Sequence, residues 1–169
     1  MGPVCDMIKK QADSNFVNLR TAILTYDRDA HVCGASAWRY VYHTIHSADK
    51  WFFNPFVYNE PSFHTEGLDN PNFSCDTVLT DEQLLDYLEQ VRRKTADYLD
   101  SINDSMLNDY PEQCKYSRIE LVLMQFRHIS VHIGLLNGQT LERTGKFPVY
   151  VTPDSLNRLD NGLFEQWSL

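Results

Sequence analysis

Apolar residues recur at intervals of three and four along four separate stretches of the chain, and this spacing is that of one face of an α-helix. The first two stretches cover residues 4–27 and 36–53. The last two cover residues 80–102 and 117–143. Four long amphipathic helices in one chain are typical of a four-helix bundle, so we expect an all-α fold.

Several residues mark the ends of these helices. Thr80 and Gln83 have the identity and spacing of a capping box at the start of the third helix. Pro55 stops the second helix, and Gly145 suits the C-terminal cap of the last one. Strand patterning is nearly absent, and residues 147–152 are the one short segment that could extend.

Two connections separate the first three helices. A break in the helical pattern falls at residues 29–34, and a much longer connection, residues 54–79, is rich in Pro, Asn, Phe and Ser. Loops of this length are uncommon and are often functional. The long connection also leaves simple up-down-up-down topology unassured. We expect it to be ordered because it carries the aromatic residues Phe56, Tyr58, Phe63 and Phe73.

Length and charge narrow the class of protein. A chain of 169 residues fits a single domain, so we expect residues 1–169 to form one. The apolar share of 43% and the charged share of 22% are those of an ordinary globular protein. The formal net charge of -8 opposes binding to nucleic acid and weakly disfavours anionic membranes. A small-molecule substrate is the partner that we expect.

The cysteines favour a reducing compartment. The four cysteines form no CxxC pair and match no zinc-finger spacing, so we expect isolated, reduced thiols in the cytoplasm. No apolar run approaches the roughly 20 residues of a membrane span. Lys9 and Lys10, with Asp6 and Asp13, interrupt the apolar core that a signal peptide needs.

The histidines carry the candidate chemistry. His128 and His132 stand four apart in the last helical stretch, so both imidazoles lie on one helical face and can converge on a metal ion. This face also holds Gln125 and borders the apolar stripe. A third ligand should come from another element, and His43 and His46 in the second stretch both offer one.

The ligand type narrows the metal and the reaction. Three neutral nitrogens suit Zn, Ni, Fe or Cu and do not suit Mg or Ca. Three protein ligands with one open position are typical of a catalytic zinc site. Ile129 follows His128, so the HExxH motif of zinc peptidases is absent, and no GxSxG, Walker A or GxGxxG motif occurs. Asp49 is either a carboxylate that orients a metal ligand or a solvated helix residue.

Two segments together resemble the DinB/YfiT-like family. Residues 36–43, followed by residues 49–52, look like the second helix of that family. Residues 127–137 are similar to its last-helix signature, a histidine pair followed by glycine, and the trailing residues 143–145 and 148–151 also fit. The resemblance covers most of the chain. It departs from the family at Leu135, where relatives often carry glutamine after the glycine.

The resemblance implies a four-helix bundle of the DinB/YfiT-like type with a divalent metal on His43, His128 and His132. It favours His43 over His46, which stays the alternative. Family members of known activity are metal-dependent transferases or isomerases that use a low-molecular-weight thiol such as bacillithiol, mycothiol or glutathione, and many relatives are homodimers. The leading hypothesis is therefore a thiol S-transferase that depends on Zn or Ni, with Fe as the alternative metal. The alternatives are a metal-dependent hydrolase and a non-enzymatic metal-binding stress-response module.

Overall fold

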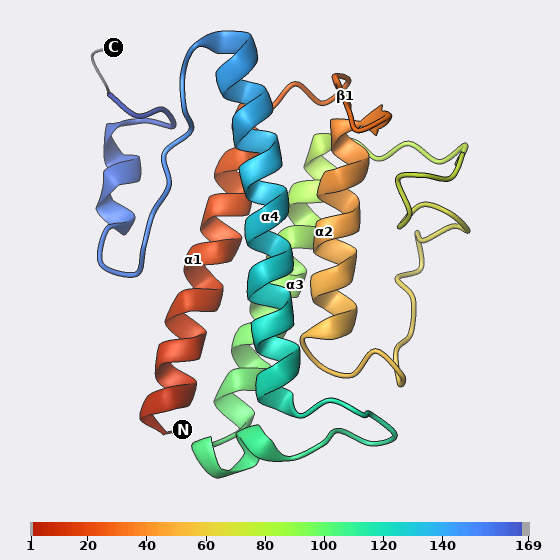
Figure 1. Cartoon of the computed structure of the whole chain (residues 1–169), viewed down its shortest axis with the longest axis vertical. Helices are drawn as coiled ribbons and strands as arrows, with labels where there is room; N and C mark the ends of the chain where they lie inside the picture. The colour runs from red at the N-terminus through yellow and green to blue at the C-terminus, as the bar shows by residue number, and fades with distance from the viewer. Residues whose placement is uncertain (1, 167–169) are drawn as a thin grey trace.

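The chain folds mostly into helices, which confirms the expected all-α class (Figure 1). The structure is a computed structural model that describes residues 2–166. All four expected helices are present, close to their expected ends. They are α1 (Pro3–Thr25), α2 (Ala37–Trp51), α3 (Asp81–Ser101) and α4 (Arg118–Thr144).

The four long helices lie side by side, and each of them packs on two others. Helices α1 and α2 both contact α3 and α4. Helices α1 and α4 run in one direction, while α2 and α3 run in the opposite direction (Figure 1). Since α2 and α3 are parallel, the chain must return along the whole side of α2 before α3 can begin. The long loop, residues 52–80, makes this return, so the topology is not up-down-up-down.

The helix ends follow the sequence signals. Thr80 and Gln83 form the predicted capping box, in which the Thr80 hydroxyl accepts from the Gln83 N–H and the Gln83 side chain accepts from the Thr80 N–H. Helix α4 ends at Gly145, whose φ of 69° is a left-handed conformation that glycine adopts without strain. The predicted caps at the start of α3 and at the end of α4 are therefore confirmed.

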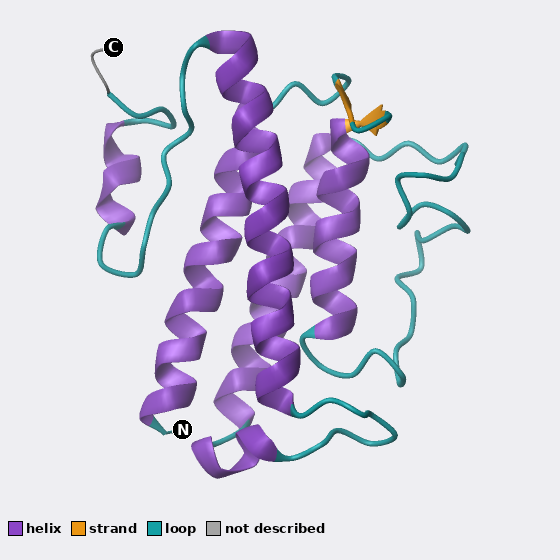
Figure 2. Cartoon of the chain, in the orientation of Figure 1, coloured by secondary structure: helices purple, strands orange, loops and turns teal. Residues whose placement is uncertain are grey.

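The expected break in the helical pattern at residues 29–34 is confirmed, because α1 ends before it and α2 begins after it. It contains most of a hairpin that the sequence did not indicate, formed by β1 (His31–Val32) and β2 (Ala35–Ser36) (Figure 2). Cys33 and Gly34 form its turn with φ values of 47° and 92°, as a tight hairpin turn requires. Residues 147–152, the segment that could extend, pair within residues 2–166 through an isolated bridge from Pro148 to Phe164 and form no longer strand there.

Two short 3-10 helices complete the described elements, η1 (Asp104–Asn108) after α3 and η2 (Leu156–Asn161) near the C-terminus. The four cysteines are free thiols, as expected. Within residues 2–166, α4 alone is long and apolar enough to cross a membrane by length and composition. Core helices of soluble proteins meet the same two criteria, so one such helix is weak evidence for a membrane span.

The apolar core lies between the four helices, and α2 is the helix most enclosed by it. No residue of α2 is exposed, whereas α3 and α4 each keep an exposed face. The core side of α2 carries Val41, Ile45 and Ala48, and Phe52 follows directly after the helix; all four residues are fully buried. The opposite side of α2 is covered by the long loop (Figure 1).

Candidate metal centre

Three histidines from two helices meet where α2 packs against α4. The Nε2 atom of His128 lies 3.1 Å from Nε2 of His43 and 3.0 Å from Nε2 of His132. Each of the three side chains offers a nitrogen within 4.8 Å of the nitrogens of the other two. The structure thus brings together the predicted last-helix pair and His43, and it places His46 elsewhere.

The spacing of the three nitrogens fits a metal-ligand sphere. Zinc held tetrahedrally at the usual Zn–N length of 2.0–2.1 Å separates its ligand nitrogens by about 3.3 Å. The observed separations of 3.1 Å and 3.0 Å are close to that value. Hydrogen bonds alone do not explain them, because one ring N–H of His128 cannot point at both His43 and His132. The buried Nδ1 atoms of His128 and His132 have no hydrogen-bond partner in the described part of the chain, so no neighbour fixes their tautomers.

The long loop orients the first of these ligands. Nδ1 of His43 lies 2.7 Å from the backbone oxygen of Asp69, and since a carbonyl only accepts, Nδ1 carries the proton. In the neutral ring Nε2 then keeps its lone pair, and that lone pair faces His128 and His132. A ring N–H held by a carbonyl is the usual second contact of a metal-binding histidine.

Partial burial keeps the last-helix pair neutral. Removal from water, with the neighbouring His43 as the second cause, lowers the pKa of His128 to about 4. Removal from water and the two neighbouring histidines lower the pKa of His132 to about 3. At neutral pH both rings are uncharged, so they can offer lone pairs to a cation.

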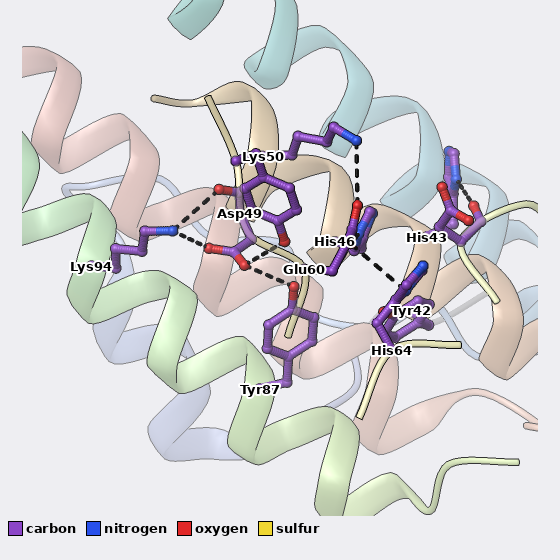
Figure 3. Close-up of polar contacts among 11 residues, drawn as sticks. Tyr42, His43, His46, Asp49, Lys50, Glu60, His64, Tyr87 and Lys94 are labelled. Carbon is purple, nitrogen blue, oxygen red and sulfur yellow. Dashed lines mark hydrogen bonds and ion pairs between the residues drawn. The ribbon is translucent and has the colours of Figure 1, made fainter. Parts of the chain in front are cut away.

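A second polar cluster, which the sequence did not indicate, lies further along α2. Nε2 of His46 is 2.5 Å from the Glu60 carboxylate, and Lys50 lies 3.5 Å from the same group (Figure 3). The Tyr42 hydroxyl is 2.7 Å from Nδ1 of His64, whose ring stacks on that of His46. His46, Glu60 and His64 lie close enough together to hold a metal ion. Glu60 is exposed, however, and an ion pair with Lys50 already accounts for its charge.

Arg39 is the main link between α2 and the long loop near the histidines. It is 9% exposed, and its guanidinium donates to the backbone oxygens of Gly67, Asn70 and Phe73. These three carbonyls flank Asp69 along the chain. The arginine therefore holds the segment of loop that in turn holds His43.

Asp49 is neither a solvated helix residue nor a neighbour of the three histidines. It is 7% exposed, and its carboxylate accepts from the hydroxyls of Tyr58 and Tyr87 and from Lys94 (Figure 3). Tyr58 lies in the long loop, while Tyr87 and Lys94 lie on α3. Both sequence-based interpretations of Asp49 were wrong, because its partners come from distant parts of the chain.

Gln125 lies one turn before His128 on the predicted face of α4. It is 3% exposed, and its Oε1 atom has no hydrogen-bond partner within residues 2–166. A buried amide oxygen without a donor costs about 1–3 kcal/mol, so it indicates a ligand or an ordered water beside it. Gln125 and His128 line one groove, which opens between α2 and α4.

No family model, no curated protein and no solved structure matches the chain. The functional interpretation therefore depends on the geometry of the site. That geometry defines a cluster of three histidines that could hold a metal ion, beside an open groove.

Proposed function

We propose that the protein binds a divalent transition metal through His43, His128 and His132 and uses it to activate a low-molecular-weight thiol for transfer to an electrophilic small molecule. The observation that carries this proposal is the convergence of three Nε2 atoms with 3.1 Å and 3.0 Å separations. Three imidazole ligands favour zinc, nickel or iron, and they leave a coordination position for a small molecule.

The residues around the cluster have defined roles in this proposal. His43, His128 and His132 hold the ion, and the Asp69 carbonyl holds His43 in the tautomer that binds metal. When bound, the ion would supply Lewis acidity that lowers the pKa of a thiol below neutral pH. The S–H bond would then break, with its proton passing to buffer. The sulfur would form a bond to the electrophilic carbon while the leaving group departs with its electron pair.

The absence of a carboxylate in the cluster favours a thiol over water as the nucleophile. Among the described residues, no Asp or Glu belongs to the group formed by the three histidines. Metal-assisted hydrolysis commonly uses such a carboxylate as a general base, whereas a metal deprotonates a thiol without one. Hydrolysis at the same site is the second candidate function, and it predicts turnover without any thiol.

We also propose that the chain belongs to the DinB/YfiT-like four-helix-bundle class. The order of the long helices supports this assignment, as does the origin of the histidines, one from α2 and two from α4. Membership would make a transferase or isomerase reaction the expected chemistry. The proposal does not depend on it, because the metal site can be tested directly.

Elemental analysis tests the metal site. Purified wild-type protein should contain about one equivalent of zinc, nickel or iron per chain, and His128→Ala should lose most of it. His31→Ala is the matched control, because His31 is exposed on β1 and outside both histidine groups. Equal metal content in the wild type and His128→Ala would refute the metal site.

A thiol-consumption assay tests the reaction. The metal-loaded protein is mixed with monochlorobimane and, in turn, with bacillithiol, mycothiol or glutathione. Thiol consumption that needs both the metal and His128 supports the proposed transfer. Ester or amide hydrolysis without thiol supports the second candidate, and tight metal binding with no turnover on any substrate would count against both reactions.

A further inference from the structure

The surface between α2 and α4 is hollowed next to His128. The α2–α4 groove has a volume of about 320 Å³, near the lower end of the range for small-molecule sites. Larger hollows lie along α1, two against α3 and one against residues 153–154, but no histidine lines any of these three. The residues that matter in the α2–α4 groove are Trp51, Met124, Gln125, Arg127, His128 and Val131.

The walls of the groove are apolar. Trp51 is contributed by the end of α2, and Met124 and Val131 by α4. Val131 is 61% exposed, so an apolar surface at the rim of the groove faces solvent. An aromatic or branched aliphatic group placed there would remove this surface from water.

Two polar groups in the groove lack a partner in the part of the chain that the structure describes. The Oε1 atom of Gln125 is buried without a donor, as described above. Arg127 is exposed and forms no ion pair within residues 2–166, whereas Arg28, Arg92 and Arg143 each pair with a carboxylate. The groove therefore offers a ligand both the Gln125 oxygen, which can accept a hydrogen bond, and the Arg127 guanidinium, which can pair with an anion.

We infer that the α2–α4 groove binds a small amphipathic anion, with an apolar body on Trp51 and Met124, a carboxylate on Arg127 and an N–H or O–H group on Gln125. We also identify this anion with the electrophilic substrate, and that identification alone rests on the proposed function. Because His128 also lines the groove, a molecule bound there lies next to the thiol that the metal would activate.

Calorimetric titration of the metal-loaded protein tests the site, with indolepropionate as the probe and indolepropionamide as its uncharged counterpart. Wild-type protein should bind the acid up to about fivefold more tightly than the amide, because an ion pair with the exposed Arg127 is worth up to about 1 kcal/mol. Arg127→Gln should abolish this preference and leave the amide affinity unchanged. Arg20→Gln is the matched control, because Arg20 is exposed on α1, away from the groove.

Gln125→Met separates a binding role from a structural one. The change removes an unsatisfied buried oxygen, so the free energy of unfolding should stay equal or rise. Binding of both probes should weaken by about fivefold, since their N–H loses its acceptor. Val131→Trp, which fills the rim of the groove, should abolish probe binding while metal content stays at the wild-type value.

The outcomes distinguish this inference from the proposed function. A preference for the acid that Arg127→Gln removes supports the groove even if no thiol is consumed. Thiol transfer without probe binding, or probe binding that Arg127→Gln and Val131→Trp leave unchanged, overturns the groove while the proposed function stands. Loss of stability in Gln125→Met without loss of probe affinity also overturns it.

Discussion

Replacing Arg39 by methionine should weaken both the fold and the metal site. The Arg39 side chain donates to Gly67 at 2.6 Å and to Asn70 at 2.8 Å, and it also donates to Phe73. Methionine fills much of the same volume but donates nothing. The variant therefore removes three bonds between α2 and the long loop and leaves the packing of α2 nearly intact.

The expected loss of stability follows from these bonds. A hydrogen bond from a charged group is worth about 1.5–3 kcal/mol, and three of them sum to about 4.5–9 kcal/mol. The three carbonyls regain water once the half-buried loop loosens, so we expect a loss below this sum, about 3–4 kcal/mol. That is less than the 5–15 kcal/mol typical of a domain, so the variant should still fold.

The consequence for the metal site follows from the position of Asp69 in the same loop segment. When the segment loosens, Nδ1 of His43 loses the carbonyl that fixes its tautomer. Loss of such a contact typically weakens metal binding by about 10- to 100-fold. Urea unfolding of the metal-free protein gives the stability change, and competition with a chromophoric chelator gives the metal affinity.

Arg93→Met is the matched control. The Arg93 side chain is 73% exposed on α3 and pairs with Glu89, so its loss should cost below about 0.5 kcal/mol and leave metal affinity unchanged. If Arg39→Met destabilises the fold but binds metal as the wild type does, the link from loop to metal site is wrong. If it changes neither quantity, the three loop bonds do not stabilise the protein.

Three further predictions follow from other parts of the structure. In the metal-free protein, the free energy of unfolding should fall as the pH drops from about 6.5 towards 4, because the lowered pKa values of His128 and His132 let the unfolded chain bind protons first. Urea unfolding at several pH values should show a weaker dependence of stability on pH for the variant that carries both His128→Ala and His132→Ala. Asn18→Ala should cost about 2 kcal/mol in urea unfolding, since buried Asn18 holds both the N–H and the C=O of Val151, and an unchanged midpoint would contradict this. Thr80→Ala should cost about 1 kcal/mol by removing the cap of α3, whereas Thr80→Ser should cost little.

The features that depend on near neighbours in sequence were predictable. The four helices, the capping box at Thr80 and the left-handed Gly145 all follow from residues within one or two turns. The hairpin was missed because Cys33 occupies a left-handed turn position that Asn, Asp or Gly usually fills. Local pattern therefore predicted the helices and failed where an atypical residue adopts an uncommon conformation.

Features that depend on contacts between distant segments were not predictable. Of the four aromatic residues that suggested an ordered long loop, Tyr58 and Phe63 contact the helices. Phe56 and Phe73 are 51% and 62% exposed, and the fully buried Leu68, which the sequence did not single out, also anchors the loop. His43 and His46 stand three apart, only about 60° around the helix. Helical periodicity could not choose between them, and the packing of α2 against α4 places His43 beside the pair.

The enclosure of α2 has a consequence for how this protein can vary. In a saturation mutagenesis library scored for folding, the tolerance of α4 to substitution should vary with the helical period. Residues such as Leu123, Arg127 and Val131 recur on its solvent side. Tolerance in α2 should be low at every position, since none of its residues is exposed. A change on the loop-facing side of α2 would need a matching change in the loop, so compensating pairs should connect these two segments more often than any others.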